Sequence, residues 1–142
     1  MDNGRLETWE AVRSYALAGN ATFTLRSMKS GERFTYKVVK LKDPEKDVWF
    51  VSVLRGADNE NDYAYIGVII AAAFRWSPKS RVGKDAQSFR VFAWFQAQLG
   101  GAGPVRADLE VWHTGRCGRC GRKLTVPESV GAGLGPECRL IA

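Results

Sequence analysis

The sequence predicts an α+β fold, in which a four-stranded antiparallel meander packs with one or two helices and a small zinc module follows. Three observations predict this fold. Apolar and polar residues alternate in stretches joined by short, turn-rich loops, as in antiparallel strands. Two other stretches repeat apolar residues at helical spacing. The three cysteines cluster near the end of the chain, which favours metal binding over disulfide pairing.

The first expected element is a helix over residues 6–18. Its apolar residues recur at helical spacing, at Leu6, Trp9, Val12 and Ala16. Gly19 and Asn20 then end the pattern as a C-cap. Strands are expected next, over residues 21–26, 33–38, 48–54 and 63–70. Because the connections between them are short, an antiparallel meander is the simplest topology.

A second helix should follow the basic loop of residues 77–84, with Asp85 as its cap. Its apolar side is formed by Phe89, Phe92, Phe95 and Leu99. Gly100 to Pro104 ends this helix and makes a flexible joint. We therefore expect an α+β domain over residues 1–101 and a zinc-binding module over residues 102–142, with a short strand around Leu109 leading into it.

Charge and hydropathy restrict the class of protein. The net charge of +6 favours an acidic partner such as nucleic acid, although solubility alone also accounts for it. The longest apolar run, residues 65–74, is too short to span a bilayer. The first residues have no apolar signal region. We therefore expect a soluble protein of the cytoplasm without a membrane partner.

The strongest motif is a set of metal-ligand residues with the spacing H-x3-C-x2-C-x17-C, at His113, Cys117, Cys120 and Cys138. Zinc takes four such ligands in a tetrahedron, and two cysteines two residues apart reach one ion from a tight turn that Gly118 and Gly121 relax. Glu137, water or a partner's residue are alternatives to His113. Gly135 and Pro136 indicate a helix start, which puts Cys138 in a first turn. Four protein ligands leave no place for an activated water, so one structural Zn²⁺ is predicted.

The C-terminal residues also resemble a known kind of sequence. The stretches RCGRCGRKLTVPES (residues 116–129) and GLGPEC (residues 133–138) are similar to an uncharacterised zinc module of small phage, prophage and plasmid proteins. Shorter upstream phrases resemble the same proteins, at residues 21–25, 33–37, 49–54, 58–63 and 92–95. The resemblance implies a mobile-element origin and a zinc site, and with a phage origin the location is the host bacterial cytoplasm. It implies no reaction.

Two basic clusters are candidates for nucleic-acid contact. The first lies in the loop before the second helix and consists of Arg75, Trp76, Lys79, Arg81 and Lys84. The second surrounds the Cys-x-x-Cys motif and consists of Arg116, Arg119, Arg122 and Lys123. Such cations can hold phosphates, and a tryptophan among them can stack on a base. The alternatives are a solvated surface and, for the second cluster, neutralisation of a zinc–thiolate charge.

The sequence offers few catalytic residues, because it has no histidine left for acid–base work, no G-x-S-x-G elbow and no Walker loop. The alternating Asp58, Glu60 and Asp62 could bind calcium or magnesium, but a polar hairpin loop is favoured because the EF-hand glycine and closing glutamate are missing. Tyr63 and Tyr65 share one face of a strand, which allows a ligand surface without favouring one. We therefore expect a non-enzymatic, zinc-containing, DNA- or RNA-binding accessory protein of a phage or mobile element. The alternative is an inhibitor that binds a host defence or regulatory protein complex.

Overall fold

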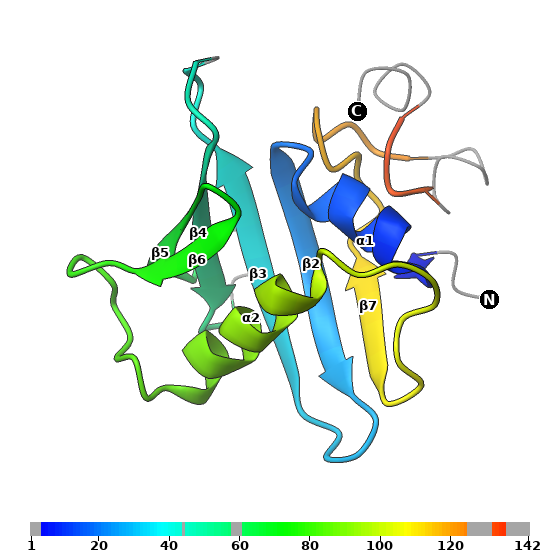
Figure 1. The fold of residues 1–142 in the computed structure, drawn as a ribbon, viewed down its shortest axis with the longest axis horizontal. Coiled ribbons are helices and arrows are strands. Elements are labelled where there is room, and N and C mark those ends of the chain that lie inside the picture. Colours follow the sequence, from blue (N-terminus) through cyan, green and yellow to red (C-terminus); the bar gives the residue numbers. More distant parts are fainter. Residues whose placement is uncertain (1–3, 44, 58–60, 125–131, 136–142) are drawn as a thin grey trace.

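The computed structural model describes residues 4–43, 45–57, 61–124 and 132–135. Within these ranges the chain forms a seven-stranded antiparallel sheet and two helices, shown in Figure 1. The strand order is β1-β7-β2-β3-β4-β5-β6. The elements are β1 (Arg5–Leu6), α1 (Trp9–Ala16), β2 (Asn20–Ser27), β3 (Arg33–Lys40), β4 (Val48–Leu54), β5 (Tyr63–Ile70), β6 (Ala73–Trp76), α2 (Gln87–Gln98) and β7 (Leu109–His113).

The predicted α+β fold built on a four-stranded meander is wrong, because β1, β6 and β7 also join the sheet. The strands β2 to β5 do follow one another as a meander, and β4 and β5 have the predicted bounds. The strand β6 returns along β5 through Ala71 and Ala72, whose φ angles are 53° and 63°. Hairpin turns with positive φ usually contain Gly or Asn, so two alanines gave no turn signal in the sequence.

Both helices differ from their predicted bounds at the N-terminal end. Leu6 lies in β1 instead of in the first helix, and α1 begins at Trp9. Thr8 caps α1, since its side chain accepts a hydrogen bond of 3.2 Å from the backbone N–H of Ala11. The prediction that Asp85 caps the second helix is wrong, because Ala86 is the N-cap and makes no side-chain cap bond.

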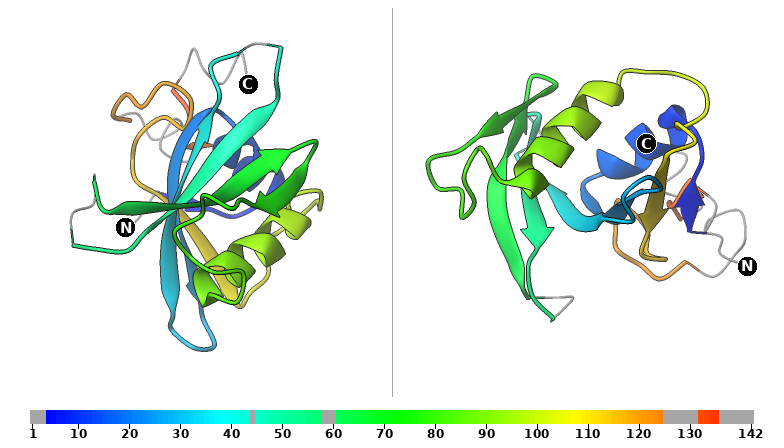
Figure 2. Two further views of the ribbon diagram at one scale, coloured as in Figure 1. Left: turned by 90° about the vertical axis from the view of Figure 1, so that its left-hand side faces the viewer. Right: turned by 90° about the horizontal axis from the view of Figure 1, so that it is seen from below.

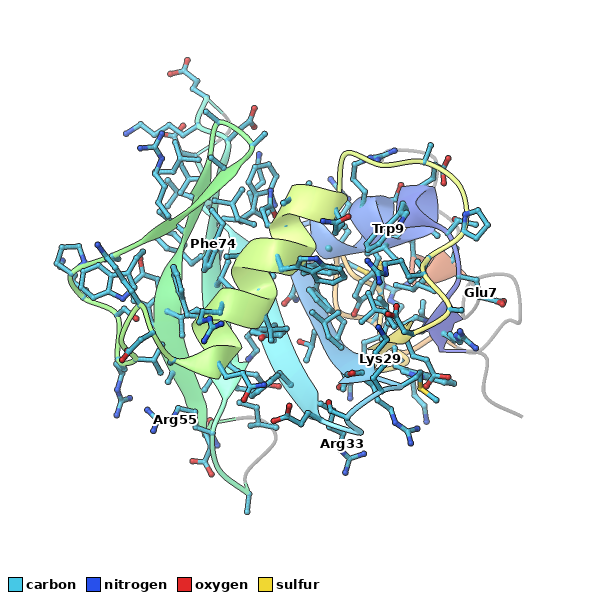
Figure 3. The ribbon with its side chains drawn as sticks, turned by 60° about the horizontal axis from the view of Figure 1, so that its bottom comes forward. Glu7, Trp9, Lys29, Arg33, Arg55 and Phe74 are labelled. Carbon is cyan, nitrogen blue, oxygen red and sulfur yellow. The ribbon has the colours of Figure 1, made fainter. Side chains whose placement is uncertain are left out.

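The core lies between the helices and one face of the sheet. Phe23 of β2 contacts Tyr15 of α1 and Phe95 of α2, with ring centroids 6.2 Å and 5.4 Å apart. Trp9 contacts the same Phe95 at 6.2 Å. Phe74 of β6 points toward α2, as Figure 3 shows, and its ring lies 4.8 Å from that of Phe92. One face of the sheet is therefore sealed by aromatic side chains from both helices.

The opposite face of the sheet carries the alternate residues of each strand. We call it the open face and define it by Thr22, Thr24, Thr35, Lys37, Phe50, Ser52, Tyr63, Tyr65 and Trp112. Neither described helix lies on this face, and Figure 2 (right) shows α2 on the opposite side of the sheet. The strands thus separate a buried apolar side from a polar and aromatic one.

The strand β7 connects the two ends of the described chain. It lies between β1 and β2, with Arg5 opposite Trp112 on one side and Phe23 opposite His113 on the other. The residues of β7 belong to the predicted module of residues 102–142, whereas β1 and β2 belong to the predicted domain of residues 1–101. The boundary proposed between them therefore runs through one continuous sheet.

Candidate metal centre and basic surfaces

A tight hairpin follows β7 and contains two of the predicted zinc ligands. We call residues 115–124 the cysteine hairpin. Its ends are joined by a hydrogen bond of 2.8 Å from Leu124 N–H to the carbonyl of Gly115. Inside it, Cys117 N–H donates to the carbonyl of Arg122 at 2.8 Å. Gly121 adopts a φ of 79°, which L side chains rarely adopt, so this turn requires a glycine.

The hairpin directs backbone N–H groups at one thiol. Cys117 Sγ accepts hydrogen bonds from the N–H groups of Arg119 and Cys120, at 3.4 Å and 3.5 Å. The Cys117 side chain is buried, whereas Cys120 is exposed. N–H groups aimed at sulfur stabilise the thiolate, which is the form that binds a metal. Cys117 therefore has the surroundings of a metal-binding thiolate, and Cys120 lies exposed in the same turn.

His113 is the last residue of β7, and its ring packs against Tyr15 of α1. It is 7% exposed, and its ring centroid lies 5.3 Å from that of Tyr15. Its Nδ1 accepts a hydrogen bond of 2.9 Å from Gly115 N–H, so in a neutral ring the proton lies on Nε2. A metal bond through Nδ1 would replace this hydrogen bond, and one through Nε2 would require the proton on Nδ1. His113 fits a metal site only if the Gly115 turn rearranges.

In the described ranges, no three His, Cys, Asp or Glu side chains gather into a group that could hold a metal ion. Cys138, Glu137 and the expected helix start at Pro136 lie outside the described residues. The zinc site of His113, Cys117, Cys120 and Cys138 therefore stays a prediction.

Tyr15 attaches the cysteine hairpin to the rest of the molecule. Its hydroxyl donates to the carbonyl of Thr22 at 2.7 Å and accepts from the N–H of the same residue at 3.1 Å. Burial raises the pKa of Tyr15, which keeps the phenol protonated and able to donate. Asn20 N–H donates to the carbonyl of Gly118 at 2.7 Å. The hairpin is thus held against α1 and the start of β2.

Gly118 provides the close approach between the hairpin and Tyr15. A Cβ at this position would lie 2.6 Å from Cδ1 and 2.9 Å from the backbone oxygen of Tyr15. We expect Gly118→Ala to lower the free energy of unfolding by about 1–3 kcal/mol, because backbone cannot move aside as a flexible side chain can. Gly100→Ala is the matched control, since nothing lies within 4 Å of its added Cβ. Urea unfolding of both variants checks this, and equal stability would contradict it.

The four cations of the hairpin are exposed but do not form one patch. Arg116 lines a hollow on the open face together with Lys37 and Tyr63. Arg119 lines a different hollow with Arg13 and Trp49, on the side of the sheet that the helices cover. Arg122 and Lys123 are exposed on the returning arm of the hairpin, where Lys123 pairs with Arg116. The hairpin therefore presents positive charge toward both sides of the sheet edge.

The first basic cluster, of Arg75, Trp76, Lys79, Arg81 and Lys84, lies at the β6 edge of the sheet, opposite the edge formed by β1. Trp76 is the last residue of β6, and its Nε1 donates to the carbonyl of Val82 in the loop that follows, at 3.0 Å. Lys84 Nζ lies 5.0 Å from the Trp76 ring centroid. Arg75, Lys79 and Arg81 are exposed. Five strand steps separate β6 from β7, which is about 24 Å at the usual spacing. The structure therefore does not bring the two predicted basic clusters together.

The segment that contains β7 and the cysteine hairpin is also the segment that resembles known sequences. Residues 107–139 match DUF6011. DUF6011 is a family of unknown function, and the matched range begins two residues before β7 and includes all three cysteines. The predicted resemblance to an uncharacterised family is confirmed for the DUF6011 segment. No curated protein and no solved structure matches the chain.

Two further predictions concern the loop before β5 and the membrane. Asp58 and Glu60 lie outside the described residues, while Asp62 lines a hollow with Arg55 and Arg81. Among the described residues, neither helix has the length and apolar character needed to cross a membrane.

Sequence reasoning gave little weight to the open face. In the sequence Thr22, Thr35 and Lys37 form the polar half of an alternating pattern, and Tyr63 and Tyr65 allow a ligand surface without favouring one. The structure places all five on one face, and all of them except Tyr65 line the hollow to which Arg116 also contributes. The available signal was the repeated use of threonine, lysine and tyrosine at the polar positions of neighbouring strands.

Proposed function

We propose that this protein is a non-enzymatic nucleic-acid-binding protein whose cysteine hairpin is held by one structural zinc ion. The observation that carries the proposal is the hairpin itself, in which backbone N–H groups face a buried thiol while four cations remain exposed around it. A small, rigid and positively charged projection suits phosphate contact. The net charge of +6 favours the same partner.

The residues that would hold the ion are Cys117, Cys120 and Cys138, with His113 as the fourth if the Gly115 turn rearranges. When bound, zinc would neutralise the thiolates and stabilise the fold of the hairpin. The protein residues do the rest: Tyr15 and Asn20 fix the hairpin on the sheet, and the exposed arginines reach the phosphates. A phage or mobile-element origin is part of the proposal and is supported by the resemblance of residues 116–138.

The test is the binding of labelled DNA and RNA oligonucleotides at two salt concentrations, measured by fluorescence anisotropy. We expect affinity to fall as salt rises, because phosphate contacts release counterions. A variant with Arg119, Arg122 and Lys123 changed to serine should bind about tenfold or more weakly at low salt. Its control has Arg33, Arg55 and Arg90 changed to serine, which alters the net charge equally at exposed positions that line neither of the hollows shared with the hairpin.

Two outcomes would contradict the proposal. The first is the absence of binding even at low salt. The second is an equal loss of affinity in both triple variants, which would mean that net charge alone attracts the oligonucleotide. If the protein instead retains one specific host protein after nuclease treatment and binds no oligonucleotide, the inhibitor alternative replaces the proposal.

A further inference from the structure

The open face combines aromatic rings with exposure to solvent. Phe50 is 38% exposed, and its ring centroid lies 6.3 Å from that of Tyr65 on the neighbouring strand. Tyr63 and Trp112 are half-buried on the same face. Large rings in this position are not needed for the core, which lies on the other side of the sheet. They offer flat apolar surfaces that a ligand can stack on.

Cations and hydroxyl groups surround these rings. A hollow of about 600 Å³ runs over the face and is lined by Lys37, Tyr63, Arg116 and the threonines of β2 and β3. Lys37 Nζ lies 4.6 Å from the Tyr63 ring centroid. Thr24 and Thr35 share a hydrogen bond of 2.7 Å between their hydroxyl oxygens. A positive charge thus stands directly beside an aromatic ring and a polar floor.

Among the residues that the structure describes, the acidic groups near this face do not cancel its charge. Glu110 shares the face, but its carboxylate forms ion pairs of 3.6 Å with Arg5 and 3.8 Å with Arg26. It also accepts a hydrogen bond of 3.1 Å from Trp112 Nε1. Asp62 lines the separate hollow with Arg55 and Arg81. The charge balance of the open face therefore favours an anionic ligand.

We propose that the open face binds single-stranded nucleic acid, with bases stacked on Tyr63 and Tyr65 and phosphates held by Lys37 and Arg116. This inference rests on the proposed function and specifies its ligand and surface. Unpaired bases expose their flat faces to aromatic side chains, whereas bases in a duplex are stacked on one another and cannot reach a sheet. Rings that lie beside cations, as Tyr63 lies beside Lys37, suit a single strand in which each base is linked to a phosphate.

The first test compares a labelled single-stranded oligonucleotide with the matching duplex. The single strand should bind more tightly than the duplex, and the variant Tyr63→Ala/Tyr65→Ala should weaken single-strand binding by about tenfold or more. The control is Trp94→Ala, which removes a ring with the same 38% exposure as Phe50 from α2, on the other side of the sheet. Tyr65→Phe should retain affinity, because stacking needs the ring and not the hydroxyl.

Two further readouts separate a binding role from a structural one. Lys37→Ala should lower the slope of log affinity against log salt by about 0.7, the value for one phosphate contact on a single strand. Amide NMR shifts of the wild-type protein should change on β2 and β3 around Thr22 and Thr35 when the oligonucleotide is added. Because the NMR measurement uses the wild-type protein, the test stays valid if an alanine variant unfolds.

The outcomes distinguish this inference from the proposed function. If the duplex binds as well as the single strand, and only the hairpin triple variant loses affinity, the open face is not the binding surface although the protein binds nucleic acid. If no oligonucleotide binds at low salt, both proposals fail. Shifts confined to the hairpin would also overturn the role of the open face.

Discussion

Replacing Cys117 and Cys120 together with serine is expected to abolish zinc binding and to unfold the cysteine hairpin. Serine hydroxyls stay protonated at neutral pH and do not replace thiolates on zinc. In the described part of this segment few apolar side chains would remain to hold it, since the buried cluster there consists of Cys117, Leu124 and Leu134. Structural zinc contributes about 10–16 kcal/mol of binding free energy in small zinc modules, far more than so small a cluster can supply.

Metal analysis of the purified protein tests this expectation directly. The wild type should contain about one zinc ion per chain, and the double variant almost none. Hydrogen exchange should show lost protection at the amides of Gly121 and Leu124, with protection retained in β3 and β4, because the main core is a separate cluster. Arg122→Ser is the control, since it changes the same hairpin and keeps both thiols. A double variant with full zinc content would remove the metal assignment.

Tyr15→Ala is expected to cause the largest loss of stability in the main core, about 3–5 kcal/mol. The side chain is 1% exposed and touches three parts of the fold: the ring of Phe23, the ring of His113 and the backbone around Gly118. Removing the ring leaves a cavity where α1, β2 and the cysteine hairpin meet. The two hydrogen bonds to Thr22 are lost as well.

A second substitution separates packing from hydrogen bonding. Tyr15→Phe keeps the ring and should cost about 1–3 kcal/mol, because the N–H and carbonyl of Thr22 lose the hydroxyl that they share. Trp94→Ala serves as the control for removal of a large ring, since that side chain is 38% exposed and should cost less. Urea unfolding of the three variants gives the order. If Tyr15→Ala proved no more harmful than Trp94→Ala, the linking role of Tyr15 would be refuted.

The sequence predicted those parts of the fold that depend on neighbouring residues. The strands β4 and β5 have their predicted bounds, and burial alternates along part of each, as at Val51 and Val53 of β4 and at Ala64 and Ile66 of β5. The tight Cys-x-x-Cys turn was also predicted from neighbouring residues, since four consecutive residues define it. Capping was harder to predict, because Thr8 and Asp85 are both good capping residues and the structure uses only Thr8.

The missed parts depend on contacts between distant residues. The strand β1 has two residues, so it is too short for any periodicity, and Leu6 fits the helical pattern equally well. The pairing of β7 with β2 joins His113 to Phe23 across 90 residues, and nothing near either residue indicates the other. The position of His113 in the candidate site likewise depends on Tyr15, which a spacing rule cannot include. Local patterns also left the open face unrecognised, because its residues come from separate strands.

The placement of β7 has a consequence for the synthesis of the protein. While a ribosome makes the chain, β2 and β3 emerge long before residues 109–113. Until then, one long edge of β2 has no neighbouring strand, and its unpaired backbone groups can recruit other chains. Completion of the sheet must therefore wait until most of the polypeptide has been made. A nascent or prematurely terminated product would be prone to aggregate, and expression should benefit from lower temperature or from chaperones that shield this edge.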